Sequence, residues 1–155
     1  MDAIKFYLNG AEVAYEGSAA DRLLDVLRDT YNCKSVKCGC KEGECGACSV
    51  LIDGTLINSC CVAMGAVEGC SIVTIEGFRE TARFAALEKA FGDIAAVQCG
   101  FCTPGLILTG VELAASGRKY TREELRKLIS GHLCRCTGYE NILNALEKVV
   151  GYPKE

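Results

Sequence analysis

Three cysteines stand close together in a glycine-rich stretch, and a fourth follows shortly after it. They are Cys40, Cys45, Cys48 and Cys60. The spacing C-x4-C-x2-C with a more distant fourth cysteine is that of a plant-type [2Fe–2S] cluster, whose two irons are held by four thiolates. Gly43 and Gly46 let this stretch double back, because glycine adopts positive φ and places no Cβ near the sulfurs. The pattern therefore predicts a cluster bound by these four thiolates.

Zinc is the alternative metal for this loop, since Zn²⁺ also accepts four thiolates. Zinc ribbons usually carry paired C-x2-C knuckles, whereas the first pair here is C-x4-C. The spacing favours iron–sulfur and leaves zinc as the alternative.

A second group of cysteines lies in the other half of the chain: Cys99, Cys102, Cys134 and Cys136. Each pair precedes a predicted helix. If those two helices lie side by side, the four thiolates meet between helix N-termini, whose dipoles and free N–H groups favour negative charge. Zinc and two redox disulfides are the alternatives, although a Cys134–Cys136 disulfide would close a very short ring with poor geometry.

Composition limits the function classes. The chain has 155 residues, a net charge of −3 and no basic run, which argues against a nucleic-acid partner. The N-terminus has no signal-peptide core, and no segment approaches the ~20 apolar residues of a membrane span. Twelve cysteines without a signal peptide indicate metal ligation in a reducing cytoplasm rather than a disulfide framework.

The first half of the chain has the pattern of a small mixed sheet. Alternating apolar residues flank Asn9-Gly10 and Asp53-Gly54, so hairpins are predicted at 4–15 and 50–57. A helix is predicted to begin at Ser18, with Leu23, Leu24 and Leu27 on one face, and a last strand at 71–75. The cysteine loop at 33–48 then lies at the rim of the sheet.

The second half changes to helical periodicity, with a domain boundary near 77–83. Four helices are predicted, at 82–91, 104–116, 122–131 and 138–150. Their expected caps are Thr103 before Pro104, capping boxes at Thr121/Glu124 and Thr137/Glu140, and stops at Gly117, Gly151 and Pro153. Gly110 in mid-helix costs about 1 kcal/mol against alanine, which predicts a close helix crossing there.

These residues together resemble the two-cluster iron–sulfur subunit of the xanthine dehydrogenase family of molybdenum hydroxylases. The matching stretches are Glu44-Cys45-Gly46-Ala47-Cys48, Gln98-Cys99-Gly100-Phe101-Cys102-Thr103-Pro104-Gly105 and Leu133-Cys134-Arg135-Cys136-Thr137-Gly138-Tyr139. Eight cysteines at matching intervals carry the resemblance over nearly the whole chain. One departure is Lys41, where the family often has glycine.

The resemblance implies an α+β fold: a ferredoxin-like β-grasp domain at 1–77 and a four-helix-bundle [2Fe–2S] domain at 78–155. It implies that the second cluster lies beside a molybdopterin, with Gln98 and Cys136 near the pterin. It also implies that electrons leave through the Cys40 cluster toward flavin. The expected partners are a large molybdopterin-binding subunit and an FAD-binding subunit.

Several residues near these motifs receive another interpretation. Cys33, Cys38, Cys61 and Cys70 fall outside both patterns and are expected to be small buried residues. His132 is expected to make hydrogen bonds in its loop rather than to bind metal. Arg135, between two thiolates, is expected to raise the cluster potential or to face a partner.

The predicted function is that of an electron-transfer subunit of an oxidoreductase complex, xanthine or purine dehydrogenase-like, with no complete active site of its own. Neither a Rossmann motif nor a P-loop is present. The alternatives are a free-standing two-cluster ferredoxin, the equivalent subunit of a CO, nicotinate, aldehyde or aromatic-acyl-CoA oxidoreductase, and a structural zinc protein.

Overall fold

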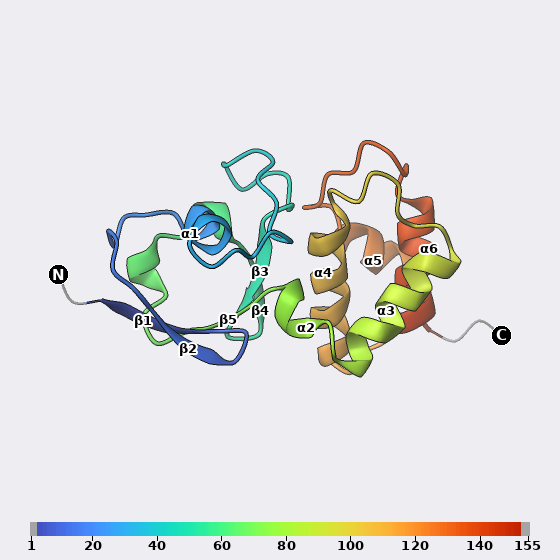
Figure 1. Cartoon of the computed structure of the whole chain (residues 1–155). Helices are drawn as coiled ribbons and strands as arrows, with labels where there is room; N and C mark the ends of the chain where they lie inside the picture. The colour runs from blue at the N-terminus through green and yellow to red at the C-terminus, as the bar shows by residue number, and fades with distance from the viewer. Residues whose placement is uncertain (1–2, 153–155) are drawn as a thin grey trace.

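The computed structural model describes residues 3–152 and has two parts that lie side by side, a sheet and a group of helices (Figure 1). The sheet part comes first in the chain. The mixed α+β class expected from the sequence is confirmed.

The sheet has five strands in the order β2-β1-β5-β3-β4. Its strands are β1 (Ile4–Leu8), β2 (Ala11–Tyr15), β3 (Ser49–Ile52), β4 (Thr55–Asn58) and β5 (Ser71–Val73). Only β1 and β5 pair in parallel, and both predicted hairpins are present with positive φ in their two-residue turns. Leu23, Leu24 and Leu27 of α1 (Leu23–Asp29) are fully buried in the core of this part.

Helix α1 begins five residues later than the sequence predicted. Ser18 and Asp21 do contact each other, but in a turn before the helix. The segment between them and α1 is extended because it pairs with the chain around residue 63: Leu23 N–H donates to Val62 O, and Met64 N–H donates to Asp21 O. A distant segment thus competes with the local capping signal.

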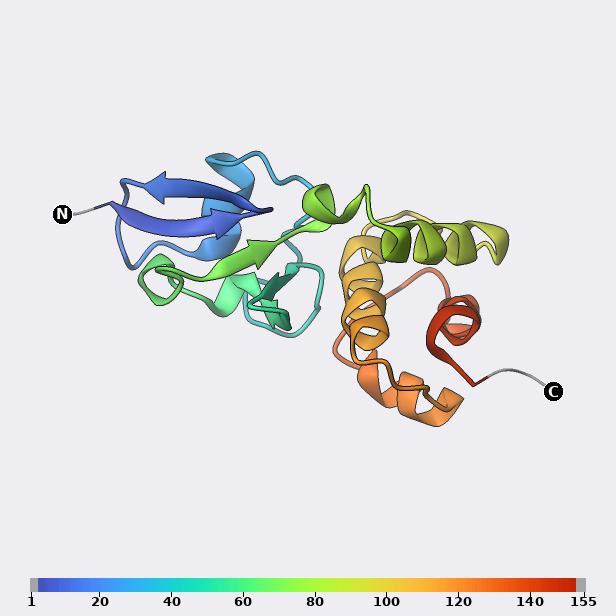
Figure 2. The same ribbon diagram turned by 90° about the horizontal axis from the view of Figure 1, so that it is seen from below.

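Helices form the second part, as expected: α3 (Ala82–Asp93), α4 (Thr103–Ala115), α5 (Arg122–Leu128) and α6 (Glu140–Val150). The short helix α2 (Ile75–Phe78), which the sequence analysis assigned partly to a strand, lies between the two parts (Figure 2). At Gly110 of α4 a Cβ would lie 2.7 Å from Leu87 Cδ2 and 3.1 Å from Leu146 Cδ2. The predicted close crossing is therefore confirmed, with α3 and α6 both packed against α4.

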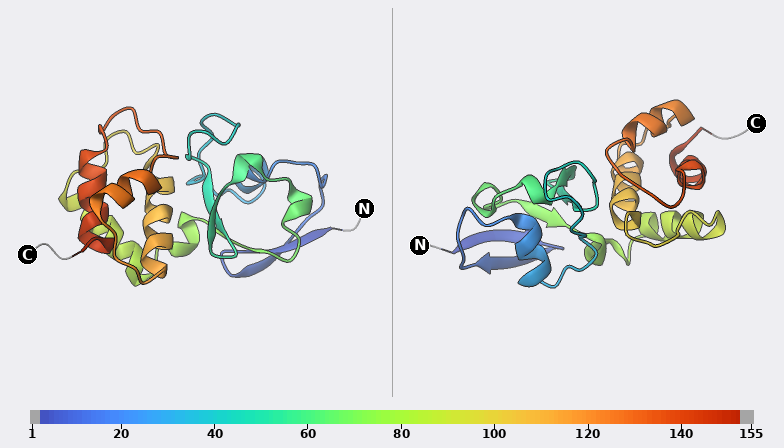
Figure 3. Two further views of the ribbon diagram at one scale, coloured as in Figure 1. Left: turned by 180° about the vertical axis from the view of Figure 1, so that it is seen from behind. Right: turned by 90° about the horizontal axis from the view of Figure 1, so that it is seen from above.

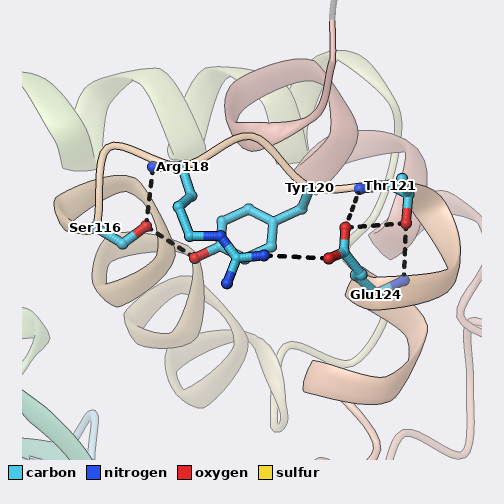
Figure 4. A network of polar contacts seen from close by, with 5 residues as sticks. All are labelled: Ser116, Arg118, Tyr120, Thr121 and Glu124. Atoms are coloured by element: carbon cyan, nitrogen blue, oxygen red, sulfur yellow. Dashed lines mark hydrogen bonds and ion pairs between the residues drawn. The ribbon is translucent and has the colours of Figure 1, made fainter.

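Three of the predicted signals for helix ends are present in the structure. The capping box Thr121/Glu124 is present, and Arg118, which reaches Glu124, lies over the Tyr120 ring (Figure 4). Gly117 has the positive φ of a helix stop, and α6 ends at Gly151. Pro153 lies outside the described residues.

Two predicted caps are wrong. Helix α4 begins at Thr103, so its cap is Cys102 and not the Thr103 hydroxyl. Helix α6 begins after Tyr139, and the Thr137 hydroxyl instead accepts from Tyr139 N–H and lies 3.0 Å from Cys134 Sγ. Both differences occur in the loops that carry the second cysteine group. There the positions of the thiols, and not helix capping, determine the backbone conformation.

The two parts are packed together along α4. Leu51 of β3 is buried in the helical core, and Leu56 N–H donates to Glu112 Oε1 of α4 at 2.9 Å. The 33–48 loop and the loops before α4 and α6 all lie along one edge of the molecule, which the rear view shows as well (Figures 1 and 3). No helix within residues 3–152 is long and apolar enough to cross a membrane.

Candidate metal centres

The first cysteine loop brings Cys40 and Cys45 together, with their side chains in contact. The Cys40 thiol also accepts hydrogen bonds from the backbone N–H groups of Glu42, at 3.5 Å, and Cys45, at 3.4 Å. These backbone hydrogen bonds lower the pKa of Cys40 to about 6. A thiol in this setting is ready to act as a thiolate ligand at neutral pH.

Cys48 and Cys60 form the second thiol pair of this loop, and both are buried. Burial raises the pKa of Cys48 to about 12, with the neighbouring Cys60 side chain contributing. The Ser59 hydroxyl donates to Cys48 O at 2.7 Å, which ties the two segments together. Asn58 Nδ2 donates to Gly43 O at 2.7 Å and holds the loop over the sheet.

The second group of cysteines also meets in pairs: Cys99 with Cys136, and Cys102 with Cys134. All four line one cavity of about 160 Å³, together with Phe101, Leu133 and Arg135. Cys102 lies directly before α4, so this cysteine pair precedes a helix as the sequence predicted. The cysteines of the C-x2-C pair and those of the C-x-C pair therefore lie close together, as the sequence predicted.

The loop before α6 is shaped by Tyr139, which was expected to be a packing residue at the helix start and does pack against the helical core. Its hydroxyl donates to His132 O at 3.1 Å and accepts from Cys134 N–H at 2.9 Å. Tyr139 itself has φ of +68°, next to Gly138 at +61°. Burial alone would raise the pKa of Cys134, but the Thr137 hydroxyl and backbone outweigh it and lower that pKa.

The eight cysteines fit two [2Fe–2S] clusters by the chemistry of their donors. Each group supplies four sulfurs as two pairs, and a two-iron cluster needs two thiolates on each iron. Within residues 3–152, no group of three or more Cys, His, Asp or Glu side chains has the spacing of ligands to one metal ion. At Gly39, a Cβ would lie 2.6 Å from Cys45 Sγ, so glycine at this position leaves room for the sulfur.

The two cysteine groups are joined by backbone contacts across the seam between the two parts. Leu133 N–H donates to Cys45 O at 3.0 Å, and the next residue is Cys134. His132, buried with 4% exposed, lies 2.7 Å by its Nε2 from Thr109 Oγ1. The expectation that the His132 side chain makes a hydrogen bond is confirmed, but its partner lies on helix α4 and not in its own loop.

The other four cysteines differ in exposure. Cys33 is buried as expected, and Cys38 and Cys70 are partly buried. Cys61 is exposed, which corrects the expectation, and its Sγ lies 3.7 Å from Cys60 Sγ. It faces outward because the residues around it form a single 3-10 turn, Ser59–Cys61, with Ser59 and Cys60 inside. None of the twelve thiols, all of which lie within the described residues, forms a disulfide.

Lys41, Gln98 and Arg135 are exposed. Lys41 has φ of +64°, the region where glycine is favoured, so the loop keeps the backbone course expected of glycine at this position. Nζ of Lys41 lies 3.7 Å from Asp25 Oδ1.

Comparison with known proteins identifies both parts. Residues 6–68 match the family described as "2Fe-2S iron-sulfur cluster binding domain", and residues 74–147 match "[2Fe-2S] binding domain". The chain is 42% identical to the nicotinate dehydrogenase small FeS subunit of Eubacterium barkeri, covering 95% of this chain and 94% of that one. It is 41% identical to the xanthine dehydrogenase iron-sulfur-binding subunit of Escherichia coli O157:H7, covering 92% and 91%.

Solved structures agree with the sequence matches. The crystal structure of quinoline 2-oxidoreductase from Pseudomonas putida 86 contains a chain with a TM-score of 0.87 and 39% identity, covering 93% of this chain and 89% of that one. The family matches, the extent of the alignments and the fold all lead to the same family. The chain belongs to the family of electron-transferring iron–sulfur subunits, with two [2Fe–2S] domains, of the molybdenum hydroxylases.

Proposed function

We propose that this chain carries electrons singly from a molybdopterin-bearing large subunit to a flavin subunit or another acceptor. The observation that carries the proposal is the Leu133 N–H to Cys45 O hydrogen bond, which links a ligand loop of one group to the residue before Cys134 of the other. Each cluster, when bound, supplies a one-electron redox centre. The chain's own residues hold the two centres at a fixed separation.

The proposed ligands of the sheet-side cluster are Cys40, Cys45, Cys48 and Cys60, and those of the helical cluster are Cys99, Cys102, Cys134 and Cys136. We propose that the ligands share irons in the pairs that the thiol contacts support: Cys40 with Cys45, Cys48 with Cys60, Cys99 with Cys136, and Cys102 with Cys134. We place the two folding units at residues 1–77 and 78–155.

The direction of transfer is supported by the exposure around the helical group. Cys99 and Cys136 are exposed, and large apolar side chains are exposed near them: Val97, Phe101 and Leu133. An exposed apolar patch of this kind marks an interaction surface. We assign it to the large subunit, with Gln98 and Cys136 toward the pterin, and the rim at 42–47 to the onward acceptor.

The substrate class is proposed from the names of the similar proteins reported above. Nicotinate, xanthine and quinoline, the compounds in their names, are nitrogen heterocycles. We therefore propose that the assembled enzyme hydroxylates a ring carbon of such a compound with oxygen from water, releasing two electrons and two protons. Twelve free thiols suit a reducing compartment, so we place the complex in the cytoplasm.

Metal analysis and copurification test this function. The purified chain should contain about four irons and about four acid-labile sulfides, two of each per cluster. Tagged and expressed with its neighbouring genes, it should copurify with a large subunit that contains molybdenum. Stoichiometric zinc without labile sulfide would refute the cluster assignment, and a chain that carries both clusters but binds no such subunit would favour the free ferredoxin.

A further inference from the structure

The chain's single histidine lies at the seam between the two cysteine loops. His132 is held on one side by helix α4, through Thr109 Oγ1 at 2.7 Å, and on the other by a hydrogen bond with the Gly46 backbone of the sheet-side loop. The ring therefore bridges the two parts of the molecule.

Two glycines make room for this ring. At Gly46, a Cβ would lie 2.4 Å from His132 Nδ1 and 2.5 Å from Gly131 O. At Gly105, a Cβ would lie 2.6 Å from Gly46 O and 3.1 Å from His132 Nδ1. One glycine comes from each part, so the close approach of the three backbone segments depends on both.

Thr109 links the ring to the backbone of helix α4. Its hydroxyl donates to Gly105 O at 3.0 Å and lies 2.7 Å from His132 Nε2. Thr109, Gly105 and His132 therefore form one polar group at the seam.

The contact lies directly beside the link between the two cysteine groups. Gly46 follows Cys45 and His132 precedes Leu133, so the His132–Gly46 contact and the Leu133 N–H to Cys45 O bond are neighbours. We infer that His132, with Thr109 and Gly46, is a positioning residue that fixes the separation of the two clusters and so sets the rate of electron transfer between them. This inference rests on the proposed function.

Two variants interrupt the contact from opposite ends without touching a cysteine. His132→Phe keeps the approximate size of the ring and removes both hydrogen bonds. Thr109→Val removes only the hydroxyl, from helix α4. Tyr120→Phe is the matched control, because it breaks a similar bond, 2.8 Å between Tyr120 Oη and Ser116 Oγ, elsewhere in the helical part (Figure 4).

The measurements are made on the assembled enzyme. Iron content and the two separate EPR signals report whether both clusters are present, and hydrogen exchange follows the Leu133 amide. The magnetic interaction between the two reduced clusters reports their separation. Both test variants should keep about four irons and speed exchange of the Leu133 amide by about tenfold, the effect of losing one hydrogen bond. They should also weaken the magnetic interaction and slow transfer between the clusters, while Tyr120→Phe changes none of these.

The outcomes separate this inference from the proposed function. Wild-type protein without two clusters would refute the function itself. Two intact clusters with unchanged magnetic interaction and unchanged Leu133 exchange in both variants would overturn the role of His132 alone. If His132→Phe loses a cluster, Thr109→Val decides by the same measurements, since its substitution lies on α4 away from the loops. His132→Gln, which can still hydrogen-bond, should restore part of the lost interaction.

Discussion

Cys40 and Cys48 belong to the same proposed site but have opposite surroundings. The Cys40 thiol accepts two backbone N–H groups, and its pKa falls to about 6, whereas burial raises that of Cys48 to about 12. A thiol must lose its proton before it binds iron. Cluster binding at the proposed site would therefore release a proton from the buried Cys48, which would couple cluster assembly to pH.

Cys45→Ala should remove the sheet-side cluster and leave the helical one, because the two proposed ligand sets share no cysteine. The iron content should fall from about four to about two per chain, with one EPR signal lost. Iron analysis and EPR of the purified complex measure this.

Cys70→Ala is the matched control, since this partly buried thiol belongs to neither set. It should keep both signals. Loss of both signals in a folded Cys45→Ala protein would show that the ligand sets are divided wrongly.

At the scale of elements, the hairpins and most helix limits follow from local chemistry. Asn9-Gly10 and Asp53-Gly54 dictate their turns wherever the strands lie. The start of α1 does not follow, because residues around Asp21 pair with Met64, far along the chain. The capping box predicted at Thr137 also fails to form. The sequence has the Thr137/Glu140 spacing of a capping box, but the Thr137 hydroxyl contacts Cys134 instead.

Gly110→Ala tests the helix crossing. Alanine gains about 1 kcal/mol of helix propensity, but its Cβ would press on Leu87 and Leu146, and overpacking costs about 1–3 kcal/mol. The net result should be a loss of about 1 kcal/mol in the free energy of unfolding. Gly92→Ala in α3, with open space around its Cβ, should instead stabilise. Equal changes in the free energy of unfolding for Gly110→Ala and Gly92→Ala, measured by thermal unfolding, would contradict the close helix crossing at Gly110.

Glu76 of α2 connects the junction between the two parts to the cysteine loop. It accepts from Ser35 N–H at 2.9 Å and from the hydroxyls of Ser35 and Thr74. Burial alone would raise its pKa, but these hydrogen bonds outweigh it and lower the pKa below 4.5. Because folding lowers the pKa of Glu76, its hydrogen bonds stabilise the fold above pH 4.5. This contribution is lost as the pH falls through the folded-state pKa.

Glu76→Gln should therefore lower the free energy of unfolding at neutral pH and flatten its decline in acid. Because the side chain is substantially exposed, the loss should be only about 0.5–1 kcal/mol. Denaturant unfolding from neutral pH to pH 3 measures it. Glu80→Gln, exposed and close in sequence, is the control and should leave the pH dependence unchanged. A parallel shift of the Glu76→Gln curve at all pH values would contradict the assignment.

At the scale of the whole molecule, cysteine spacing predicts two four-cysteine groups, but not how they meet. The pairing of Cys99 with Cys136, and of Cys102 with Cys134, crosses between two loops, so neither C-x2-C nor C-x-C is a pair in space. The contact between the two parts at His132 cannot be read from the sequence either, because His132 and Gly46 are 86 positions apart in the chain. Contacts of this kind depend on the packing of the two parts, which no local pattern encodes.

The same packing leaves the helical cysteine group open to one side, and this predicts where the large subunit binds. Val97 is 41% exposed beside this group, while Tyr7 on the sheet is 45% exposed and far from it in the chain. Val97→Glu would bury an unpaired charge at the proposed interface and should weaken assembly by about a hundredfold. Tyr7→Glu, similar in exposure, should assemble normally.

Titration of the large subunit onto the loaded chain measures both affinities, with iron content confirming that the clusters are retained. Hydrogen exchange on assembly should become slower at 97–101 and 133–136, because these loops would lose contact with water in the complex. Protection confined to 42–47 would place the large subunit at the other cluster and reverse the direction of transfer. Equal weakening by Val97→Glu and Tyr7→Glu would mean that the interface extends over both parts, against the orientation proposed here.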